Sequence, residues 1–264
     1  MRTVRSDDGT TIAYEVTGAG HPIVLVGGAF NDRNSPAAGL PLARLLAPHL
    51  QVVTFDRRGR GDSGDGPEYA VEREVEDVAA LLEDLGATAM LYGHSSGAVL
   101  ALKAVLAGLE VERLVFFEPP LALRPEETGR NDGLAARVSE MVAAGRRADA
   151  VVEFLVNVVG LPEQMVAGMR QAPHWPGLVA MAHTLPYELA VTGSVRLGPG
   201  EELPVHVPTL VIEGDLSPAE LRAAAQECAD QIPGSTLTTL EGKAHDADPE
   251  SIAGAILQWL EVGA

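Results

Sequence analysis

The sequence predicts an α/β fold, with a mostly parallel sheet flanked by helices and an all-helical segment inserted into it. Short apolar runs typical of buried strands alternate with stretches whose apolar residues recur every three or four positions. This alternation indicates parallel strands, because each parallel connection crosses the sheet and usually does so as a helix. Between residues 121 and 203 the alternation stops, and the apolar spacing is helical throughout.

Seven segments are predicted strands because they are short, rich in apolar and β-branched residues, and bounded by turn residues. They are residues 10–16, 22–26, 52–55, 89–92, 114–117, 209–212 and 236–240. The predicted helices between them are residues 40–50, 71–85, 96–107, 219–232 and 252–260. The helical insert is interpreted as a cap over one end of the sheet. The sequence therefore predicts a core of residues 1–120 and 204–264, and a cap of residues 121–203.

The charge of the chain excludes two classes of partner. Its 264 residues include 19 basic and 37 acidic ones, which gives a formal net charge of −18. Binding to nucleic acid or to an anionic membrane surface rests on lysine and arginine, so neither partner is expected. Residues 121–203 hold seven arginines against ten acidic residues, so most of the negative charge belongs to the core. We expect a solvated acidic surface rather than a charged pocket.

Other features of the composition set the cellular context and the character of the pocket. The single cysteine, Cys228, excludes an internal disulfide. No apolar stretch is long enough for a signal segment or a membrane span, so we expect a cytoplasmic protein. Because only 4% of the residues are aromatic, a mainly aliphatic pocket is expected.

Residues 93–97, Gly-His-Ser-Ser-Gly, fit the pattern G-x-S-x-G, which places a serine on a sharp turn between a strand and a helix. Glycine is needed on both sides of this turn because larger side chains would collide with the neighbouring backbone. A predicted strand runs into the motif and an apolar helix leaves it, as this turn requires. We therefore predict that Ser95 is a nucleophile.

This motif and three other stretches resemble those of the α/β-hydrolase superfamily. Within that superfamily, the chain is similar to the serine hydrolases with a helical cap. Residues 27–30, Gly-Gly-Ala-Phe, resemble the family's oxyanion loop, and residues 56–63, Asp-Arg-Arg-Gly-Arg-Gly-Asp-Ser, resemble its D-x-R-G-x-G-x-S loop. Residues 242–245, Gly-Lys-Ala-His, resemble its histidine segment. The resemblance implies a mostly parallel eight-stranded sheet with the cap inserted after the sixth strand. It also implies a serine nucleophile, a histidine base and a carboxylate that orients the histidine.

His245 is the candidate base, since it lies in a loop between a predicted strand and the last helix. An imidazole is suited to take the proton of a serine near neutral pH. By resemblance, the two backbone N–H groups that stabilise an oxyanion belong to Ala29 and Ser96. The family often has a histidine before the oxyanion glycine, whereas this chain has Gly27, so we expect the loop to be braced differently.

The carboxylate has two candidates, because the family's usual position holds Ser217. We interpret Ser217 as part of an S-x-x-E capping box with proline at the first helical position. Glu118 is preferred as the acid, since in the haloalkane-dehalogenase branch the acid can follow the corresponding strand. A carboxylate directly after an apolar strand also needs a partner. Asp215 is the alternative, and Asp248 is interpreted as the cap of the final helix.

Several large side chains are candidate pocket residues: Phe30, His94, Met165, Met169, Trp175, His183 and Tyr187. His94 is expected to turn away from the nucleophile and to support the turn. The arginines at positions 57, 58 and 60 are flanked by carboxylates and are interpreted as structural rather than ligand-binding. No cofactor is expected, and the scattered histidines predict no metal site.

The sequence thus predicts a cofactor-independent serine hydrolase that acts on a small-molecule substrate through an acyl-enzyme. The expected substrate is an ester, thioester or lactone of small to medium size and apolar character. Two alternatives stay open: a carbon–carbon hydrolase or biosynthetic lyase or cyclase on the same triad, and a non-catalytic homologue that binds a small molecule. Epoxide hydrolysis and dehalogenation are disfavoured by Ser95, since in this fold both use an aspartate nucleophile.

Overall fold

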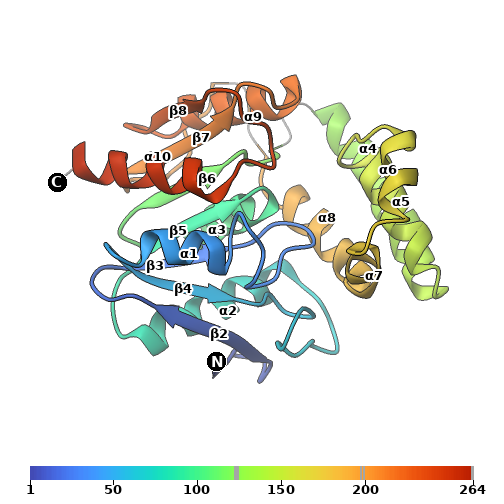
Figure 1. Cartoon of the computed structure of the whole chain (residues 1–264), viewed down its shortest axis with the longest axis horizontal. Helices are drawn as coiled ribbons and strands as arrows, with labels where there is room; N and C mark the ends of the chain where they lie inside the picture. The colour runs from blue at the N-terminus through green and yellow to red at the C-terminus, as the bar shows by residue number, and fades with distance from the viewer. Residues whose placement is uncertain (122–124, 197, 199, 263–264) are drawn as a thin grey trace.

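An eight-stranded sheet runs through the core in the order β1-β2-β4-β3-β5-β6-β7-β8 (Figure 1). The computed structural model describes residues 1–121, 125–196, 198 and 200–262. The strands are β1 (Arg2–Arg5), β2 (Thr11–Thr17), β3 (Pro22–Val26), β4 (Gln51–Phe55), β5 (Met90–His94), β6 (Leu114–Phe117), β7 (Thr209–Gly214) and β8 (Thr236–Leu240). Strands β3 to β8 pair in parallel, and β2 pairs antiparallel with both β1 and β4.

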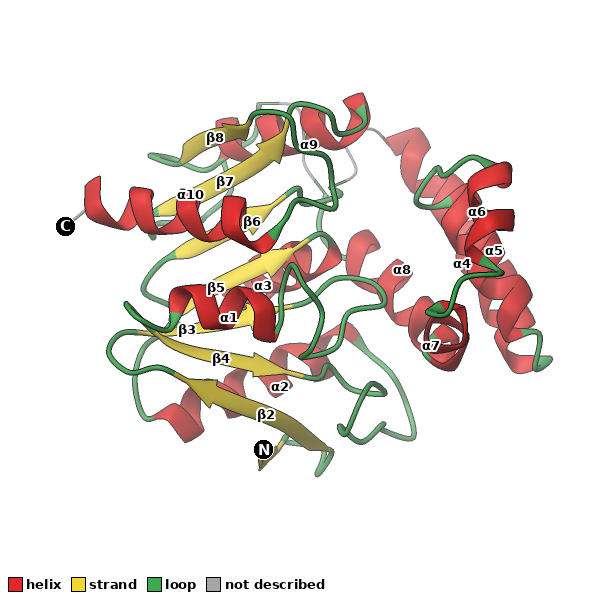
Figure 2. Cartoon of the chain, viewed as in Figure 1, coloured by secondary structure: helices red, strands yellow, loops and turns green. Residues whose placement is uncertain are grey.

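Helices cover both faces of the sheet (Figure 2). One face packs against α1 (Leu40–Leu46) and α10 (Pro249–Val262), which also contact each other. The other face packs against α2 (Val71–Leu85), α3 (Ser96–Leu106) and α9 (Ala219–Gln231). This three-layered arrangement buries the apolar central strands on both sides, as expected for a parallel sheet.

The chain between β6 and β7 forms a helical insert beyond the carboxyl ends of the strands (Figure 1). Its elements are α4 (Pro125–Ala143), α5 (Arg147–Asn157), α6 (Glu163–Met169), α7 (Trp175–Ala180), the 3-10 helix η1 (Ala182–Thr184) and α8 (Leu185–Gly193). The insert has an apolar cluster of its own, in which Val138, Phe154 and Leu185 are buried. Its position leaves the carboxyl edge of the sheet facing the insert.

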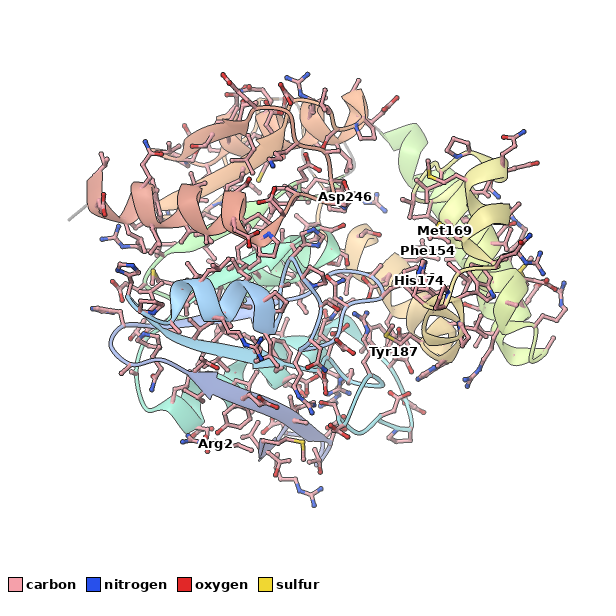
Figure 3. All side chains as sticks on the ribbon, in the orientation of Figure 1. Arg2, Phe154, Met169, His174, Tyr187 and Asp246 are labelled. Carbon is pink, nitrogen blue, oxygen red and sulfur yellow. The ribbon has the colours of Figure 1, made fainter. Side chains whose placement is uncertain are left out.

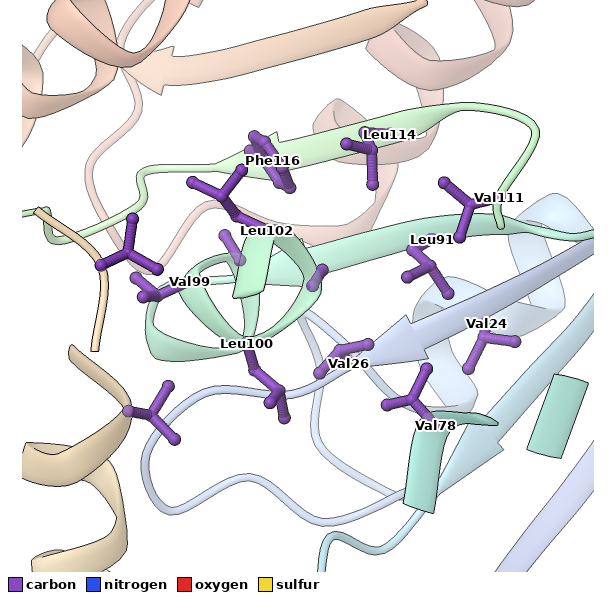
Figure 4. Close-up of a cluster of buried hydrophobic side chains, with 14 of the residues drawn as sticks. Val24, Val26, Val78, Leu91, Val99, Leu100, Leu102, Val111, Leu114 and Phe116 are labelled. Atoms are coloured by element: carbon purple, nitrogen blue, oxygen red, sulfur yellow. The ribbon is translucent and has the colours of Figure 1, made fainter. Parts of the chain in front are cut away.

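Helix α3 is the centre of the larger apolar cluster (Figure 4). It is apolar on nearly all sides, so Val99, Leu100 and Leu102 are fully buried. Figure 4 shows these side chains between the sheet and the neighbouring elements, close to Val26 and Phe116. The packing fixes the start of α3 against β5, and therefore the turn that joins them.

The predicted fold class is confirmed, including the insertion after the sixth strand. The sequence did not predict β1, because this exposed edge strand consists of polar residues apart from Val4 and carries no apolar pattern. The predicted capping box at Ser217 is wrong. Helix α9 begins at Ala219 with the extended Pro218 at its N-cap and no side-chain cap, so Ser217 lies one residue too early. Within the described part of the chain, no helix combines the length and apolar content needed to cross a membrane.

Replacing Gly93 with alanine tests the packing of the turn. A Cβ there would lie 2.3 Å from the Cα of Ala98, so Gly93→Ala should lower the free energy of unfolding by about 2 kcal/mol or more. Gly254→Ala in α10 is the matched control, since a Cβ there meets open space and helix propensity improves by about 0.5–1 kcal/mol. Urea unfolding measures both variants, and a Gly93→Ala variant as stable as the control would contradict this packing.

Candidate active site

Ser95 lies on the sharp turn between β5 and α3. Its backbone has φ 55° and ψ −125°, outside the regions that ordinary residues prefer. A Cβ at Gly93 or Gly97 would lie within 2.3 Å of backbone atoms, so the glycines on both sides allow the close crossing of strand and helix. The Ser95 N–H donates a hydrogen bond to the carbonyl oxygen of Phe117 at 2.9 Å, which holds the turn against the end of β6. Ser95 is partly exposed, as its predicted role as a nucleophile requires.

Left-handed backbone marks three non-glycine residues in the described part of the chain: Phe30 (φ 58°), Ser95 (φ 55°) and Glu118 (φ 45°). Each follows or lies close to the carboxyl end of a central strand, β3, β5 or β6. Such backbone costs on the order of 1–3 kcal/mol per residue and persists where the surrounding structure enforces it. The three sites of strain coincide with the predicted oxyanion loop, nucleophile and acid.

Glu118 and His245 are joined by a hydrogen bond of 2.6 Å between Oε2 and Nδ1. Glu118 directly follows β6, and its side chain is 0% exposed. His245 lies in the loop between β8 and α10 and is partly exposed. The bond through Nδ1 leaves Nε2 as the ring nitrogen free to exchange a proton with another group.

The carboxylate of Glu118 is held from several directions. Its Oε1 accepts a hydrogen bond from the Gly214 N–H at 2.8 Å. Burial alone would raise the pKa of Glu118, but the contacts with His245, the Ser217 hydroxyl and the Gly214 N–H outweigh it and lower the pKa. The carboxylate therefore stays ionised, and it can stabilise a positive charge on His245.

The alternative acid, Asp215, is turned elsewhere. It is exposed, and its Oδ1 accepts a hydrogen bond from the Gly242 N–H at 2.7 Å. Asp248 accepts from the Ser251 N–H at 2.9 Å, which agrees with its prediction as a helix cap. Of the carboxylates considered from sequence, the structure brings only Glu118 within hydrogen-bonding distance of the His245 ring.

The predicted oxyanion loop lies against Ser95. A Cβ at Gly28 would be 2.8 Å from the His94 carbonyl oxygen and 3.0 Å from the Cβ of Ser95, so glycine allows the loop to approach the turn this closely. Asn31 braces the loop: its Oδ1 accepts from the Gly28 N–H at 3.0 Å, and its own N–H donates to the Gly28 carbonyl at 3.2 Å. The sequence predicted that a loop with Gly27 would be braced differently from the family's pattern, but it did not single out Asn31 as the residue that braces it.

His94 packs beside Phe117 and His245 at the end of β5. Its ring is nearly buried, stacks on Phe117 with centroids 5.3 Å apart, and lies 5.2 Å from the His245 ring. Its Nε2 is 3.4 Å from the His245 carbonyl oxygen. Burial, and to a lesser extent the neighbouring His245, lowers the pKa of His94 to about 3. His94 is therefore an uncharged packing group near neutral pH.

The other candidate pocket residues fall into different environments. Phe30 packs edge to face on Phe154 of α5, with ring centroids 5.6 Å apart. Met169 belongs to the same apolar surroundings, whereas Met165 is 54% exposed and we leave it out of the pocket. Figure 3 shows Phe154, Met169 and His174 on the part of the insert nearest the core, with Asp246 on the facing edge of the core.

Trp175, His183 and Tyr187 have structural partners instead. Trp175 is buried within the apolar cluster of the insert. His183 Nε2 lies 2.8 Å from the carbonyl oxygen of Gly59. Tyr187 stacks on Tyr69 at 3.8 Å between centroids, and its hydroxyl donates to the Asp65 carboxylate. The last two residues thus join the insert to the loop that follows β4.

The arginine cluster is buried and paired, in agreement with its structural interpretation. Arg57 binds Glu74, and Arg58 binds Asp77 and Asp8. Sequence reasoning missed the carboxylate that completes the cluster, Glu188 of α8, which pairs with both Arg57 and Arg60. No local pattern marks this residue, because its two arginine partners lie more than a hundred positions away in the chain.

Comparison with known proteins agrees with this architecture. The sequence pattern of the alpha/beta hydrolase family matches residues 16–255, so the chain belongs to this family and is an alpha/beta hydrolase enzyme. The crystal structure of an alpha/beta hydrolase from Sphaerobacter thermophilus DSM 20745 is 45% identical and covers 98% of this chain and 100% of its own, with a TM-score of 0.85.

Two more distant relatives carry other activity names. An esterase from Exiguobacterium antarcticum shares the fold at 20% identity, with a TM-score of 0.70 over 98% of each chain. A non-heme haloperoxidase from Rhodococcus erythropolis is 29% identical over 177 residues, which are 65% of this chain. The matched region spans 54% of the length of that curated relative.

Replacing His94 with asparagine tests the buried neutral imidazole. In the unfolded chain a histidine binds a proton below about pH 6.5, whereas folded His94 does so only near pH 3. The unfolded state therefore binds more protons in this window, and His94 lowers stability by about 1.4 kcal/mol per pH unit as the pH falls. His94→Asn should lose less stability than wild type between pH 6 and pH 4 in urea unfolding, and the exposed His49→Asn should follow wild type. Parallel curves for wild type and His94→Asn would contradict the assignment.

Proposed function

We propose that this enzyme is a serine hydrolase that cleaves esters, thioesters or lactones of small to medium apolar molecules through an acyl-enzyme. The observation that carries the proposal is the 2.6 Å pair of Glu118 and His245 next to the strained turn of Ser95. The pair supplies an oriented base, and the turn presents a partly exposed hydroxyl at the same edge of the sheet. The esterase from Exiguobacterium antarcticum shares this fold, which is compatible with the proposed reaction class.

In the proposed reaction, Ser95 Oγ forms a bond to the acyl carbon while its proton passes to His245 Nε2. Glu118 holds the other ring nitrogen and stabilises the imidazolium ion. The tetrahedral intermediate collapses, and the leaving alcohol or thiol takes the proton from His245. A water molecule then attacks the acyl-enzyme, gives one proton to His245 and releases the acid, and the proton returns to Ser95.

The developing oxyanion is proposed to accept hydrogen bonds from the Ala29 and Ser96 N–H groups. The closeness of Gly28 to Ser95 supports this role, because a Cβ added to Gly28 would lie only 3.0 Å from the Cβ of Ser95. The loop that carries Ala29 therefore lies directly against the proposed nucleophile. Ser96 is the first residue of α3, so its N–H lies at the positive end of the helix. Two such donors are the usual requirement for acyl transfer.

The substrate is proposed to lie between the oxyanion loop and the helical insert, which then acts as a cap. Ala29, Phe30 and Met169 pack around the apolar cluster of the insert. The nearby arginines are already paired with carboxylates, so they offer no charge to an anionic substrate. The net charge of −18 also disfavours strongly anionic molecules and nucleic acids.

Labelling with a fluorophosphonate probe tests the nucleophile. The wild-type protein should form an adduct on Ser95, located by mass analysis, and should hydrolyse p-nitrophenyl acetate or butyrate. Ser95→Ala should remove both signals without changing thermal stability by more than a few degrees. A stable wild type with no adduct on Ser95 would contradict the enzyme mechanism, and an adduct without ester hydrolysis would favour carbon–carbon cleavage or non-catalytic binding.

Substituting the two carboxylates separately tests the acid. Glu118→Gln should lower kcat by about 10³–10⁴-fold, because an amide can favour the wrong ring tautomer of His245 and cannot balance its charge. Asp215→Asn should retain kcat within a few-fold, since Asp215 binds only the Gly242 N–H. Steady-state kinetics on the same ester separate the two, and the reverse order of effects would overturn the assignment of Glu118.

A further inference from the structure

A single carboxylate of the helical insert reaches into the core beside the candidate active site. Glu188 of α8 is 1% exposed and lies 2.9 Å from Arg57 Nη1. It also forms an ion pair with Arg60 Nη2 and accepts a hydrogen bond from the Ser96 hydroxyl. Three core side chains from two separate segments therefore converge on one residue of the insert.

The two arginines held by Glu188 in turn hold the oxyanion loop. Arg60 Nη1 donates to the carbonyl oxygens of Gly28 at 2.7 Å and Asn31 at 3.1 Å. Arg57 Nη1 donates to the carbonyl oxygen of Gly27 at 3.1 Å. The two arginines thus hold the oxyanion loop through its backbone carbonyl oxygens and leave the backbone N–H groups of the loop to other partners.

The bond to Gly28 has a direct consequence for Ala29. The Gly28 carbonyl and the Ala29 N–H belong to the same planar trans peptide unit, so they point in opposite directions. An arginine that fixes the carbonyl therefore fixes the direction of the N–H. Arg60 sets the orientation of one proposed oxyanion donor through this peptide.

The second proposed donor is tied to the same carboxylate. Ser96 supplies its N–H at the start of α3, and its own hydroxyl donates to Glu188 Oε2. Both donors are thus linked to Glu188, one through Arg60 and the other through the Ser96 side chain. The carboxylate lies outside the reacting atoms but reaches each donor through one intermediate group.

The charges in this cluster balance internally. Arg57 is also bound by Glu74 through two hydrogen bonds of 2.6 Å, so two arginines face two carboxylates. Burial lowers the pKa of Arg60, and the charge of Glu188 opposes this effect. All three guanidinium nitrogens of Arg57 and both Nη atoms of Arg60 are bonded to carboxylates or backbone carbonyls, and only the buried Nε of Arg60 has no partner among the residues that the structure describes. The two positive charges are therefore already paired, which leaves the cluster unsuited to bind an anionic ligand. A role in orienting the loop accounts for these contacts.

We propose that Glu188 is a positioning residue that aligns both oxyanion donors and makes the activity depend on docking of the insert. This inference rests on the proposed serine hydrolase function. Because α8 carries Glu188, the insert does more than cover the substrate: its last helix completes the alignment of the core. Undocking of α8 would leave Arg57 and Arg60 facing each other without their shared carboxylate.

Three variants test the proposal. Glu188→Gln keeps the shape of the side chain but removes its charge. The double variant Arg60→Met with Glu188→Met removes one charge of each sign, so the net charge of the cluster is unchanged. It provides a folded protein to test if Glu188→Gln alone fails to fold. Asp77→Asn is the matched control, because it removes a buried carboxylate from Arg58, an arginine of the same loop with no contact to residues 27–31.

The first readout is catalysis by the intact protein on a p-nitrophenyl ester. Misaligned donors should lower kcat at least about tenfold with KM changed less than about threefold, since loss of a whole donor costs about 10²–10³. The affinity for a trifluoromethyl ketone, which forms an oxyanion on Ser95, should fall by the same factor. Asp77→Asn should retain both values. Folded Glu188 variants with wild-type kcat and inhibitor affinity would overturn the proposal and leave the hydrolase function intact.

The second readout does not depend on turnover. Amide hydrogen exchange followed by mass spectrometry should show at least about fivefold faster exchange in peptides spanning residues 27–31 for the double variant, and no change there for Asp77→Asn. Unchanged exchange in the double variant would overturn the proposal whether or not the wild type hydrolyses an ester. Failure of the wild type to react with the probe or with any ester would instead count against the hydrolase function.

Discussion

The structure of the candidate active site depends on one buried carboxylate. A charged group at the end of a fully buried strand is costly unless it is paired and hydrogen-bonded. Glu118 meets this requirement through the Gly214 N–H at the end of β7 and the His245 ring in the loop after β8. This one charge therefore links the end of β6 to the end of β7 and to the loop that follows β8. The Ser95 N–H binds the carbonyl of the residue before Glu118, so the nucleophile turn is fixed by the same strand end.

The local signals in the sequence predicted much of this arrangement. The spacing of Gly93, Ser95 and Gly97, together with the predicted strand before them and the apolar helix after them, identified the turn, and the structure shows the steric conflict that larger side chains would meet at both glycines. The helical and strand periods gave most elements within a few residues of their observed bounds. Glu118 was preferred to Asp215 by resemblance to the haloalkane-dehalogenase branch and by the cost of an unpaired buried charge, and the second reason is a local argument with a long-range result.

Other features lie beyond such reasoning. Ser217 fits a capping pattern, but Pro218 holds an extended backbone and the helix begins only at Ala219. Strand β1 is an exposed edge without an apolar face, so its pairing with β2 leaves no mark on its composition. Glu188 and Ser96 are 92 positions apart, and their contact depends on how the insert docks on the core. Polar contacts between distant segments carry no periodicity, and only the folded chain reveals them.

Nuclear magnetic resonance of the His245 ring tests the central claim most directly, since it reports the protonation of each ring nitrogen in the resting enzyme. With Glu118 bound at Nδ1, the neutral ring should carry its proton on Nδ1, seen as a strongly downfield resonance, and should leave Nε2 unprotonated and available to Ser95. This resonance should disappear in Glu118→Gln and persist in Asp215→Asn. A proton on Nε2 in the neutral wild-type ring, or a downfield resonance that survives the loss of the Glu118 charge, would contradict the account.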